Sequence, residues 1–535
     1  MADRVASPAP PPPGSPRSWL PLILIPAIYL VVGFVAYRSI LGTYFLSDDF
    51  AYLHDIAVAH SPSIMVSALA ERYFRPMVVF VYYANYQISG LHPLSYHASI
   101  VLLNVVDASL LFFLGRALSA PPLVAPLGGL LFLVFGGHSE AITWISGMAD
   151  PLVTMCVLSA MLLFLAALRD MRPMRWIAAV WVLFAAALLA KESAAILPGI
   201  LVALAALAAP EGARGRRWRV LAITLAGMVV VAAAYLILRT SVLGFTFVRL
   251  EGLGTNRHLI AMTRAFLIRS FLPQSGLALT IFINRLDVLV GVPLVVMVLW
   301  GRSWSAIRPL ILIALCLAMA LAPVLPLSIS LGDTQSERLI YMASAFAMLG
   351  LVWMMGLAIQ GKRGLIAAVS ILAVGNLVML NRFNQNWREA SALIEKALPA
   401  FAETIRTHGR AGRPVVFVNL PDSVRGAYVF RRGFPEALRL AAPDQHAAFA
   451  DLSVLSVYTV TDMAKAVHVT PVGPHGLNVH LGGGVLVWSA PPTARVGLRD
   501  WTTESFGIDF TPMAAGSLVL YFTPQKVAVV DGGPF

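Results

Sequence analysis

Two adjacent carboxylates, Asp48 and Asp49, follow the first long apolar segment of the chain by about ten residues. A carboxylate there could act as a general base on the hydroxyl of a bound molecule, or the pair could hold a divalent cation. The same residues would also start a helix well, because aspartate is a common N-cap residue. Spacing alone favours helix capping over catalysis, and both interpretations stay open at this point.

A second polar group, His138 and Glu140, occupies a short segment between two apolar blocks, with Trp144 and Asp150 just after it. Histidine and glutamate two residues apart could hydrogen-bond a sugar, or complete a metal site with one of the two aspartates. The alternative is a solvated turn that Trp144 anchors at a membrane interface. The residues alone favour neither interpretation.

Basic residues stand where anions would meet a membrane surface. Lys191 and Glu192 lie at a chain reversal between two apolar blocks. Lys191 could neutralise a lipid phosphate as a compact point charge, or it could snorkel beside the neighbouring glutamate. Arg338, with Tyr341 one turn further on, suits an anionic headgroup, and Arg75 is a further candidate of the same kind.

The second apolar segment carries polar residues of its own. His97 lies near its start, and Asn104 and Asp107 follow at a spacing that puts them on one helix face. A carboxylate near the middle of a membrane must face other protein, because exposure to lipid is costly. We therefore expect Asp107 to make a structural polar contact inside a helix bundle.

The elements that must position these residues are membrane helices. Only 12% of the 535 residues are charged and 58% are hydrophobic. A soluble domain carries about 25% charged residues, so an ordinary soluble enzyme and a disordered chain are both excluded. Blocks of about 20 apolar residues are long enough to cross a bilayer. We predict eleven, near residues 19–37, 95–115, 122–137, 149–168, 175–190, 193–209, 219–239, 286–301, 308–326, 339–357 and 364–381.

Lysine and arginine gather in alternate short loops, which predicts the orientation of the chain. The net charge of +12 comes largely from arginines at the ends of apolar blocks, which indicates membrane orientation and not nucleic-acid binding. The positive side faces the cytoplasm, so we predict a cytoplasmic N-terminus and a C-terminal region outside the inner membrane of a bacterium, in the periplasm. Two cysteines, each within an apolar block, offer no disulfide framework and no zinc site.

Three regions follow from these patterns. Residues 1–18 are proline-rich and are predicted to be a disordered cytoplasmic tail. Residues 19–381 form an all-α polytopic membrane bundle with large outer loops at 38–94 and 240–285. Residues 382–535 begin with an amphipathic helix and continue with strand-like runs separated by turn residues, which predicts a small mixed α/β domain on the outer face.

Several short motifs, taken in this order, resemble the membrane glycosyltransferases of the GT-C fold. They are most similar to the protein O-mannosyltransferase relatives that include the transmembrane-and-tetratricopeptide-repeat proteins. The motifs are Phe45-Leu-Ser-Asp48-Asp49-Phe50, Arg75-Pro76, His92-Pro-Leu-Ser-Tyr-His97 leading to Asn104, His138-Ser-Glu140-Ala-Ile-Thr-Trp144-Ile-Ser-Gly147-Met-Ala-Asp150, Lys191-Glu192-Ser193 and Glu337-Arg338-Leu-Ile-Tyr341. They run over roughly residues 20–360, whereas the outer C-terminal region does not match and tetratricopeptide repeats are absent from the sequence.

The resemblance implies an enzyme that transfers a sugar, with inversion, from a polyprenyl-phosphate-linked donor to a hydroxyl of a glycan, lipid or protein acceptor. An aspartate of the Asp48-Asp49 pair would be the general base. Residues that would bind substrate or lipid phosphate are Arg75, His97, His138, Glu140, Lys191, Glu192, Arg338 and Tyr341.

Two other classes stay open from the sequence. The first is a flippase or transporter of lipid-linked saccharides, although such proteins tend to show repeats and interrupted midplane helices, and no repeat is visible here. The second is a non-catalytic envelope scaffold. Motifs for nucleotide phosphates and for serine hydrolases are missing from the sequence, so an ATP-driven pump and a serine hydrolase are disfavoured.

Overall fold

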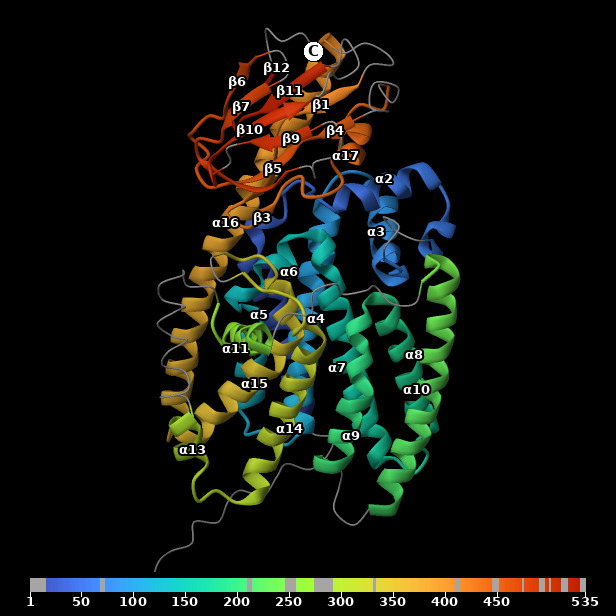
Figure 1. Ribbon diagram of the computed structural model, residues 1–535. Coiled ribbons are helices and arrows are strands. Elements are labelled where there is room, and N and C mark those ends of the chain that lie inside the picture. Colours follow the sequence, from blue (N-terminus) through green and yellow to red (C-terminus); the bar gives the residue numbers. More distant parts are fainter. Residues whose placement is uncertain are drawn as a thin grey trace, which may run out of the picture.

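The computed structural model places a helical bundle beneath a strand-rich C-terminal domain (Figure 1). The structure describes residues 16–67, 73–208, 214–245, 256–273, 292–330, 333–408, 414–444, 452–473, 476–489, 496–499, 502–510 and 518–529. Most of the tail predicted to be disordered therefore lies outside the described residues, and residues 16–18 already belong to the first helix.

The bundle consists of apolar helices, because a helix satisfies its own backbone hydrogen bonds where no water is present. Seven described helices are long and apolar enough to cross a membrane, or eight if a pair bent by 48° is counted as one span. The prediction of eleven spans is therefore not confirmed. The bundle helices are α1 (Pro16–Ala36), α4 (Leu94–Ala117), α5 (Val124–Leu133), α7 (Ala149–Arg169), α8 (Met174–Ala190), α9 (Leu197–Leu207), α10 (Arg214–Leu243), α11 (Asn256–Phe271), α13 (Val292–Leu299), α14 (Trp304–Leu321), α15 (Tyr341–Ala358) and α16 (Lys362–His408).

The bent pair consists of α5 and the short helical segment Gly136–Thr143, which continues α5 after a bend of 48°. The helix ends at Leu133, and the chain turns through η3 (Gly136–His138) into α6 (Ser139–Thr143) before η4 (Ile145–Met148) and α7. The side chains of His138 and Glu140 in this segment are fully buried. The interpretation of the segment as a solvated turn is therefore wrong.

A layer of short helices separates the bundle from the C-terminal domain (Figure 1). Its main members are α2 (Asp49–Ala59) and α3 (Pro76–Ser89), with η1 (Arg38–Ile40) and η2 (Pro62–Val66) beside them. Proline at the first position of α3 suits a helix start, because its fixed φ is helical and its missing N–H has no partner to lose there. Both helices come from the predicted outer loop 38–94.

The C-terminal domain is built on the end of α16, which runs without a break through the predicted boundary at residue 381. The apolar face predicted for this helix is buried at Trp387, Ile394 and Phe401. Three four-stranded sheets follow, in the orders β12-β11-β1-β4, β6-β7-β10-β9 and β3-β2-β5-β8, and α17 (Phe434–Ala441) is the helix between β3 and β4. The strands are β1 (Val415–Phe417), β2 (Leu420–Val424), β3 (Ala427–Tyr428), β4 (Leu452–Val454), β5 (Ser456–Val460), β6 (His468–Val472), β7 (Gly476–His480), β8 (Gly484–Ser489), β9 (Val496–Arg499), β10 (Ser505–Phe510), β11 (Leu518–Phe522) and β12 (Val527–Val529).

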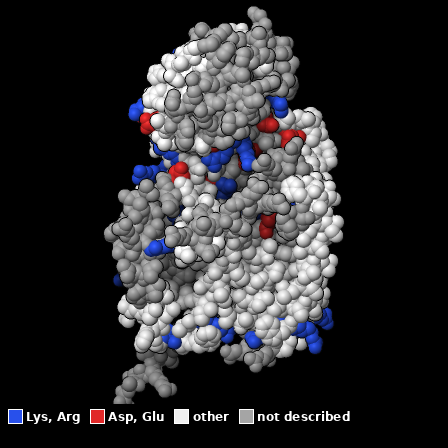
Figure 2. Space-filling model, in the orientation of Figure 1, with Lys and Arg blue, Asp and Glu red and all other residues white. Residues whose placement is uncertain are grey.

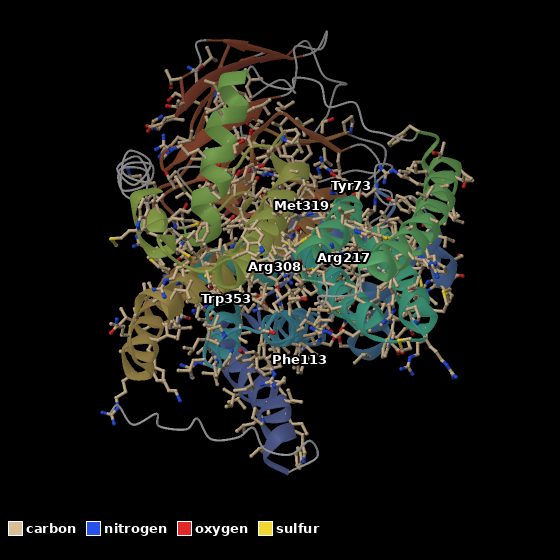
Figure 3. All side chains as sticks on the ribbon, turned by 90° about the horizontal axis from the view of Figure 1, so that it is seen from below. Tyr73, Phe113, Arg217, Arg308, Met319 and Trp353 are labelled. Carbon is tan, nitrogen blue, oxygen red and sulfur yellow. The ribbon has the colours of Figure 1, made fainter. Side chains whose placement is uncertain are left out.

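Charged residues mark the two ends of the bundle. Figure 2 shows lysine and arginine side chains at the end away from the C-terminal domain and in the seam beneath that domain. Seen from below in Figure 3, Arg217 of α10 and Arg308 of α14 belong to the first group. The loops that the positive-inside rule assigns to one side thus share one end of the bundle, and the C-terminal domain sits at the other.

Candidate active site

A cavity of about 1190 Å³ lies where the bundle, the α2–α3 layer and the C-terminal domain meet. Five of the ten residues proposed from the sequence line it, although they are far apart along the chain. They are Asp48, Arg75, Lys191, Glu192 and Arg338. Acidic and basic groups that are distant along the chain therefore share one cavity, and Asp49 is not among them.

Asp48 presents its carboxylate to this cavity without a hydrogen-bond partner among the described residues. It occupies the N-cap position of α2, yet its side chain makes no capping hydrogen bond, so the capping interpretation does not hold. Burial raises the pKa of Asp48, and the positive charges of Arg432, Arg338, Arg75 and Arg431 act against that rise. The Asp48 carboxylate therefore has its oxygens available for a ligand and lies among positively charged side chains.

Asp49 points the other way, into the protein. One carboxylate oxygen accepts hydrogen bonds from the Tyr82 hydroxyl (2.7 Å), the Ser146 amide (2.8 Å) and the Ser146 hydroxyl (2.6 Å), and the other accepts from the Leu46 amide (2.9 Å). These contacts tie the start of α2 to α3 and to η4. Asp49 therefore holds its neighbour Asp48 in place, and its own oxygens have little capacity left for another ligand.

The burial of Asp49 has a measurable consequence for stability against pH. Loss of solvation raises the pKa of Asp49 to about 6, from 3.8, although its hydrogen bonds favour the charged form. Because the folded pKa exceeds the unfolded one, the group's stabilising contribution is complete below about pH 4 and is lost as pH rises through about 6.

We expect the melting temperature of the wild type in detergent to fall relative to that of Asp49→Asn between pH 4 and pH 7. The rise in the pKa of Asp49 from 3.8 to about 6 corresponds to a loss of about 3 kcal/mol in the free energy of unfolding over that interval. Parallel melting curves for the two proteins across the range would contradict the assignment.

Lysine and arginine in the bundle wall are each held by a carboxylate. Lys191 Nζ lies 2.5 Å from Asp150 Oδ1, and both side chains are largely buried. Burial lowers the pKa of Lys191, while Asp150 opposes that shift. Glu192 bridges two arginines, with Oε1 2.7 Å from Arg239 Nη1 and Oε2 3.6 Å from Arg75 Nη2. These pairs fix the directions of three cations that line one cavity.

Arg338 joins the bundle to the C-terminal domain. Its guanidinium pairs with the fully buried Glu140, and its backbone N–H donates to Glu140 Oε2 over 3.1 Å. The hydroxyl of Tyr428, from β3, donates to Glu140 Oε1 at 2.9 Å and accepts from Arg338 Nη1 at 3.2 Å. The guanidinium also lies over the Trp144 ring, 5.0 Å from its centroid. Glu140 therefore acts on the cavity through Arg338 and does not line it.

Three predicted substrate-binding residues lie inside the protein, away from the cavity. His97 Nε2 contacts the hydroxyl and the carbonyl of Thr43, both at 2.9 Å. His138 Nε2 meets the hydroxyl of Ser344 at 2.8 Å. The Tyr341 hydroxyl lies 2.9 Å from both Asn104 Oδ1 and Asp107 Oδ2. The structure thus places His97, His138 and Tyr341 in the packing of the bundle, and Asp107 makes the internal polar contact expected of it.

The proposed divalent-cation site at Asp48 and Asp49 does not fit the donor set. The two carboxylates face opposite directions, and Asp49 already accepts four hydrogen bonds. Within the described ranges, no three histidine, cysteine, aspartate or glutamate side chains are grouped as metal ligands. No step below is therefore assigned to a metal.

The cavity continues from this charged region into an apolar channel between α8 and α10. Phe184 and Leu188 line it from α8, and Leu225, Met228 and Leu236 line it from α10. The cavity thus combines a charged head region with a tail region whose walls are hydrocarbon. That combination suits an amphiphile with an anionic headgroup.

Several cavity residues were not proposed from the sequence. Asp150 and Trp144 belong to a quoted motif, which gives them no role in binding or catalysis. Tyr52, Arg239 and Arg432 lie outside the motifs. Charge against the positive-inside trend is the signal that could have singled out Arg239, which ends an apolar helix at the domain end of the bundle. Arg432 lies in a region without a motif.

The fold and the cavity define a multi-pass membrane protein with a charged site at one end of its bundle. No protein-family model matches the chain. The chain is similar to the protein O-mannosyl-transferases Tmtc1 and Tmtc2 of Drosophila melanogaster, at 34% identity over 123 residues and 35% over 130 residues. It is also 28% identical over 183 residues to the protein O-mannosyl-transferase TMTC4 of Homo sapiens. The resemblance inferred from the motifs is therefore confirmed.

These matches span a small part of each protein. They cover 23% of this chain and 14% of each Drosophila protein, and 28% of this chain and 25% of the human protein. Two solved structures overlap loosely. ArnT from Cupriavidus metallidurans bound to undecaprenyl phosphate has a TM-score of 0.42 at 16% identity, covering 85% of this chain and 97% of that one. The oligosaccharyltransferase of Archaeoglobus fulgidus has a TM-score of 0.44 at 12% identity, covering 80% of this chain and 62% of that one.

Proposed function

We propose that the protein is an integral membrane glycosyltransferase that moves a hexosyl or pentosyl group from a polyprenyl-phosphate-linked donor to an acceptor hydroxyl, with inversion. The observation that carries the proposal is the unpartnered Asp48 carboxylate beside Arg75, Lys191 and Arg338 in one cavity. A glycosyl phosphate needs a base for the incoming hydroxyl and cations for the departing phosphate, and both are present. The similarity to protein O-mannosyl-transferases supports the same class.

The proposed reaction balances with the groups on the cavity wall. The acceptor oxygen attacks the anomeric carbon from the face opposite the phosphate, and Asp48 takes the hydroxyl proton. The bond between that carbon and the phosphate oxygen breaks, and the oxygen keeps the electron pair. The charge that develops there is met by the arginines and by Lys191, which the carboxylates of Asp150, Glu192 and Glu140 hold in position.

The apolar channel between α8 and α10 supports a lipid-linked donor. A prenyl chain would lie along Phe184, Leu188 and Met228, with its phosphate towards Lys191 and Arg75. The cluster of basic residues at the opposite end of the bundle supports a cytoplasmic location for that end. The site, the C-terminal domain and the transfer reaction would then be on the periplasmic face of a bacterial inner membrane.

The proposal is tested by reconstituting the full-length protein in liposomes that contain a radiolabelled polyprenyl-phosphate mannose and a lipid and glycan extract of the bacterial envelope. We expect release of the polyprenyl phosphate together with a labelled product, and loss of both with Asp48→Asn. Movement of intact donor across the bilayer without a new glycosidic bond would make the protein a flippase. Full product formation by Asp48→Asn would contradict the assignment of the base.

A further inference from the structure

The turn at residues 428–433 of the C-terminal domain contributes Arg432 and Gly433 to the lining of the cavity. The Ser47 amide donates to the Val429 carbonyl over 2.9 Å, and the Arg432 amide donates to the Ser47 hydroxyl over 3.3 Å. Gly433 passes so close that an added Cβ would lie 2.5 Å from the Ser47 carbonyl oxygen, and its φ of +72° favours glycine. The turn is therefore seated directly on the segment that presents Asp48.

Arg432 places a positive charge in the cavity, and no carboxylate of the described residues forms an ion pair with it. Five basic side chains line the cavity, and four of them pair with acids: Lys191 with Asp150, Arg75 and Arg239 with Glu192, and Arg338 with Glu140. Within the part of the chain that the structure describes, the guanidinium of Arg432 makes no ion pair and no hydrogen bond. The neighbouring Arg431 differs, because Asp422 holds it through contacts of 2.9 and 2.6 Å.

Other groups near Arg432 do not neutralise it. Glu436 also lines the cavity, but its nearest basic partner is Arg439, one helical turn further along α17, at 4.0 Å. Asp48 feels the charge of Arg432, which acts against the effect of burial on the Asp48 carboxyl, without forming an ion pair with it. An arginine that is exposed, unpaired and next to the proposed base has its donors free for a ligand.

We propose that Arg432 binds an anionic group of the acceptor, so that the enzyme acts on hydroxyl acceptors that carry a phosphate or a carboxylate. This inference rests on the proposed transferase function and adds the chemical class of the second substrate. Lys191, Arg75 and Arg338, each paired with a carboxylate, serve the lipid phosphate. Arg432 belongs to a different domain and lies next to the base that must receive the acceptor's proton.

Phosphorus NMR of the full-length protein in detergent tests the proposal with two probes whose signals are separate, farnesyl phosphate and inorganic phosphate. With farnesyl phosphate saturating, we expect inorganic phosphate still to bind the wild type. The variant Arg432→Gln should weaken the binding of inorganic phosphate by about 10- to 100-fold, which is the usual contribution of hydrogen bonds to a charged group. It should leave the affinity for farnesyl phosphate unchanged. Arg432→Lys should keep part of the binding, and Arg406→Gln on the surface of α16 should match the wild type.

The outcomes separate this inference from the proposal on which it rests. Displacement of inorganic phosphate by farnesyl phosphate in the wild type would mean one shared site and would overturn the inference. Equal weakening of both probes by Arg432→Gln would assign Arg432 to the donor, and unchanged phosphate binding would remove it from either site. Failure of farnesyl phosphate to bind the wild type counts against the lipid-linked donor, and so against the proposed function itself.

Discussion

Replacing Asp48 with asparagine is expected to lower the turnover number for sugar transfer by about 10²- to 10⁴-fold, the usual contribution of a general base. Asparagine keeps the size and shape of the side chain but cannot take the acceptor proton. The side chain of Asp48 makes no hydrogen bond in the described protein, so the variant should fold and bind donor like the wild type. The measurement is single-turnover transfer in liposomes at saturating donor.

A matched control is available on the same helix. Asp55 also lines the cavity, about two turns along α2 from Asp48, and its carboxylate pairs with His54 at 3.4 Å. Asp55→Asn should leave the turnover number close to that of the wild type. Equal losses in the two variants would mean that removing any negative charge from the cavity lowers the rate, and Asp48 would lose its specific role.

The pH dependence of transfer should carry the same signature. A base works only when deprotonated, so the rate should fall as pH is lowered through the pKa of Asp48. Burial raises that pKa, and the surrounding arginines limit the rise. The acid limb of the rate profile should therefore lie above the ordinary range of an aspartate in water. The slow transfer that remains in Asp48→Asn should lack this limb.

The positions of Asp48 and Asp49 show why sequence could predict the site but not its members. Successive residues on a helix point about 100° apart, so one aspartate faces the cavity and the other faces the protein. Only the packing of α2 against α3 and η4 decides which is which. The motif names both aspartates as candidates without distinguishing them, because a motif does not contain the phase of the helix.

Arg432 and Tyr428 show a second limit. Arg432 lines the cavity and Tyr428 contacts Arg338 only because the C-terminal domain is docked on the rest of the protein, and nothing in the local sequence signals this contact. Local patterns did predict much else. The strand-like runs at 414–420, 467–470, 484–488, 518–522 and 527–530 correspond to β1, β6, β8, β11 and β12. Periodicity reports which face of an element is apolar, and docking between elements needs the third dimension.

The positions of His97, His138 and Tyr341 show the opposite error. The resemblance to membrane glycosyltransferases implies a substrate-binding role for each of them. In the structure their polar atoms bond to Thr43, Ser344, Asn104 and Asp107 within the bundle. Such pairs satisfy the need for a partner without any ligand. A motif alone does not distinguish a polar side chain that is satisfied in this way from one that binds a ligand.

The pair of Glu140 and Arg338 should be a sensitive point for stability. Glu140 is fully buried and Arg338 is 27% exposed, so Glu140→Gln removes a charge that the protein has enclosed and leaves the arginine without its counterion. Removing one partner of a buried ion pair typically costs about 3–5 kcal/mol. We expect a loss of that size in the free energy of unfolding, measured by denaturant titration in mixed micelles. Glu403→Gln, which breaks the exposed pair with Arg406, should leave the free energy of unfolding close to that of the wild type.

The double variant Glu140→Gln/Arg338→Met separates the two roles of this pair. Replacing both charges leaves no uncompensated ion, so much of the lost stability should return, because an apolar replacement of a buried pair is often nearly neutral. Affinity for farnesyl phosphate should nevertheless stay low, since the guanidinium that faces the cavity is gone. If the double variant is restored in stability and binds farnesyl phosphate as the wild type does, Arg338 is only a structural link between the bundle and Tyr428. If stability returns and binding does not, Arg338 both binds the lipid phosphate and stabilises the protein. The ion pair with Glu140 then links the C-terminal domain to the lipid-phosphate site.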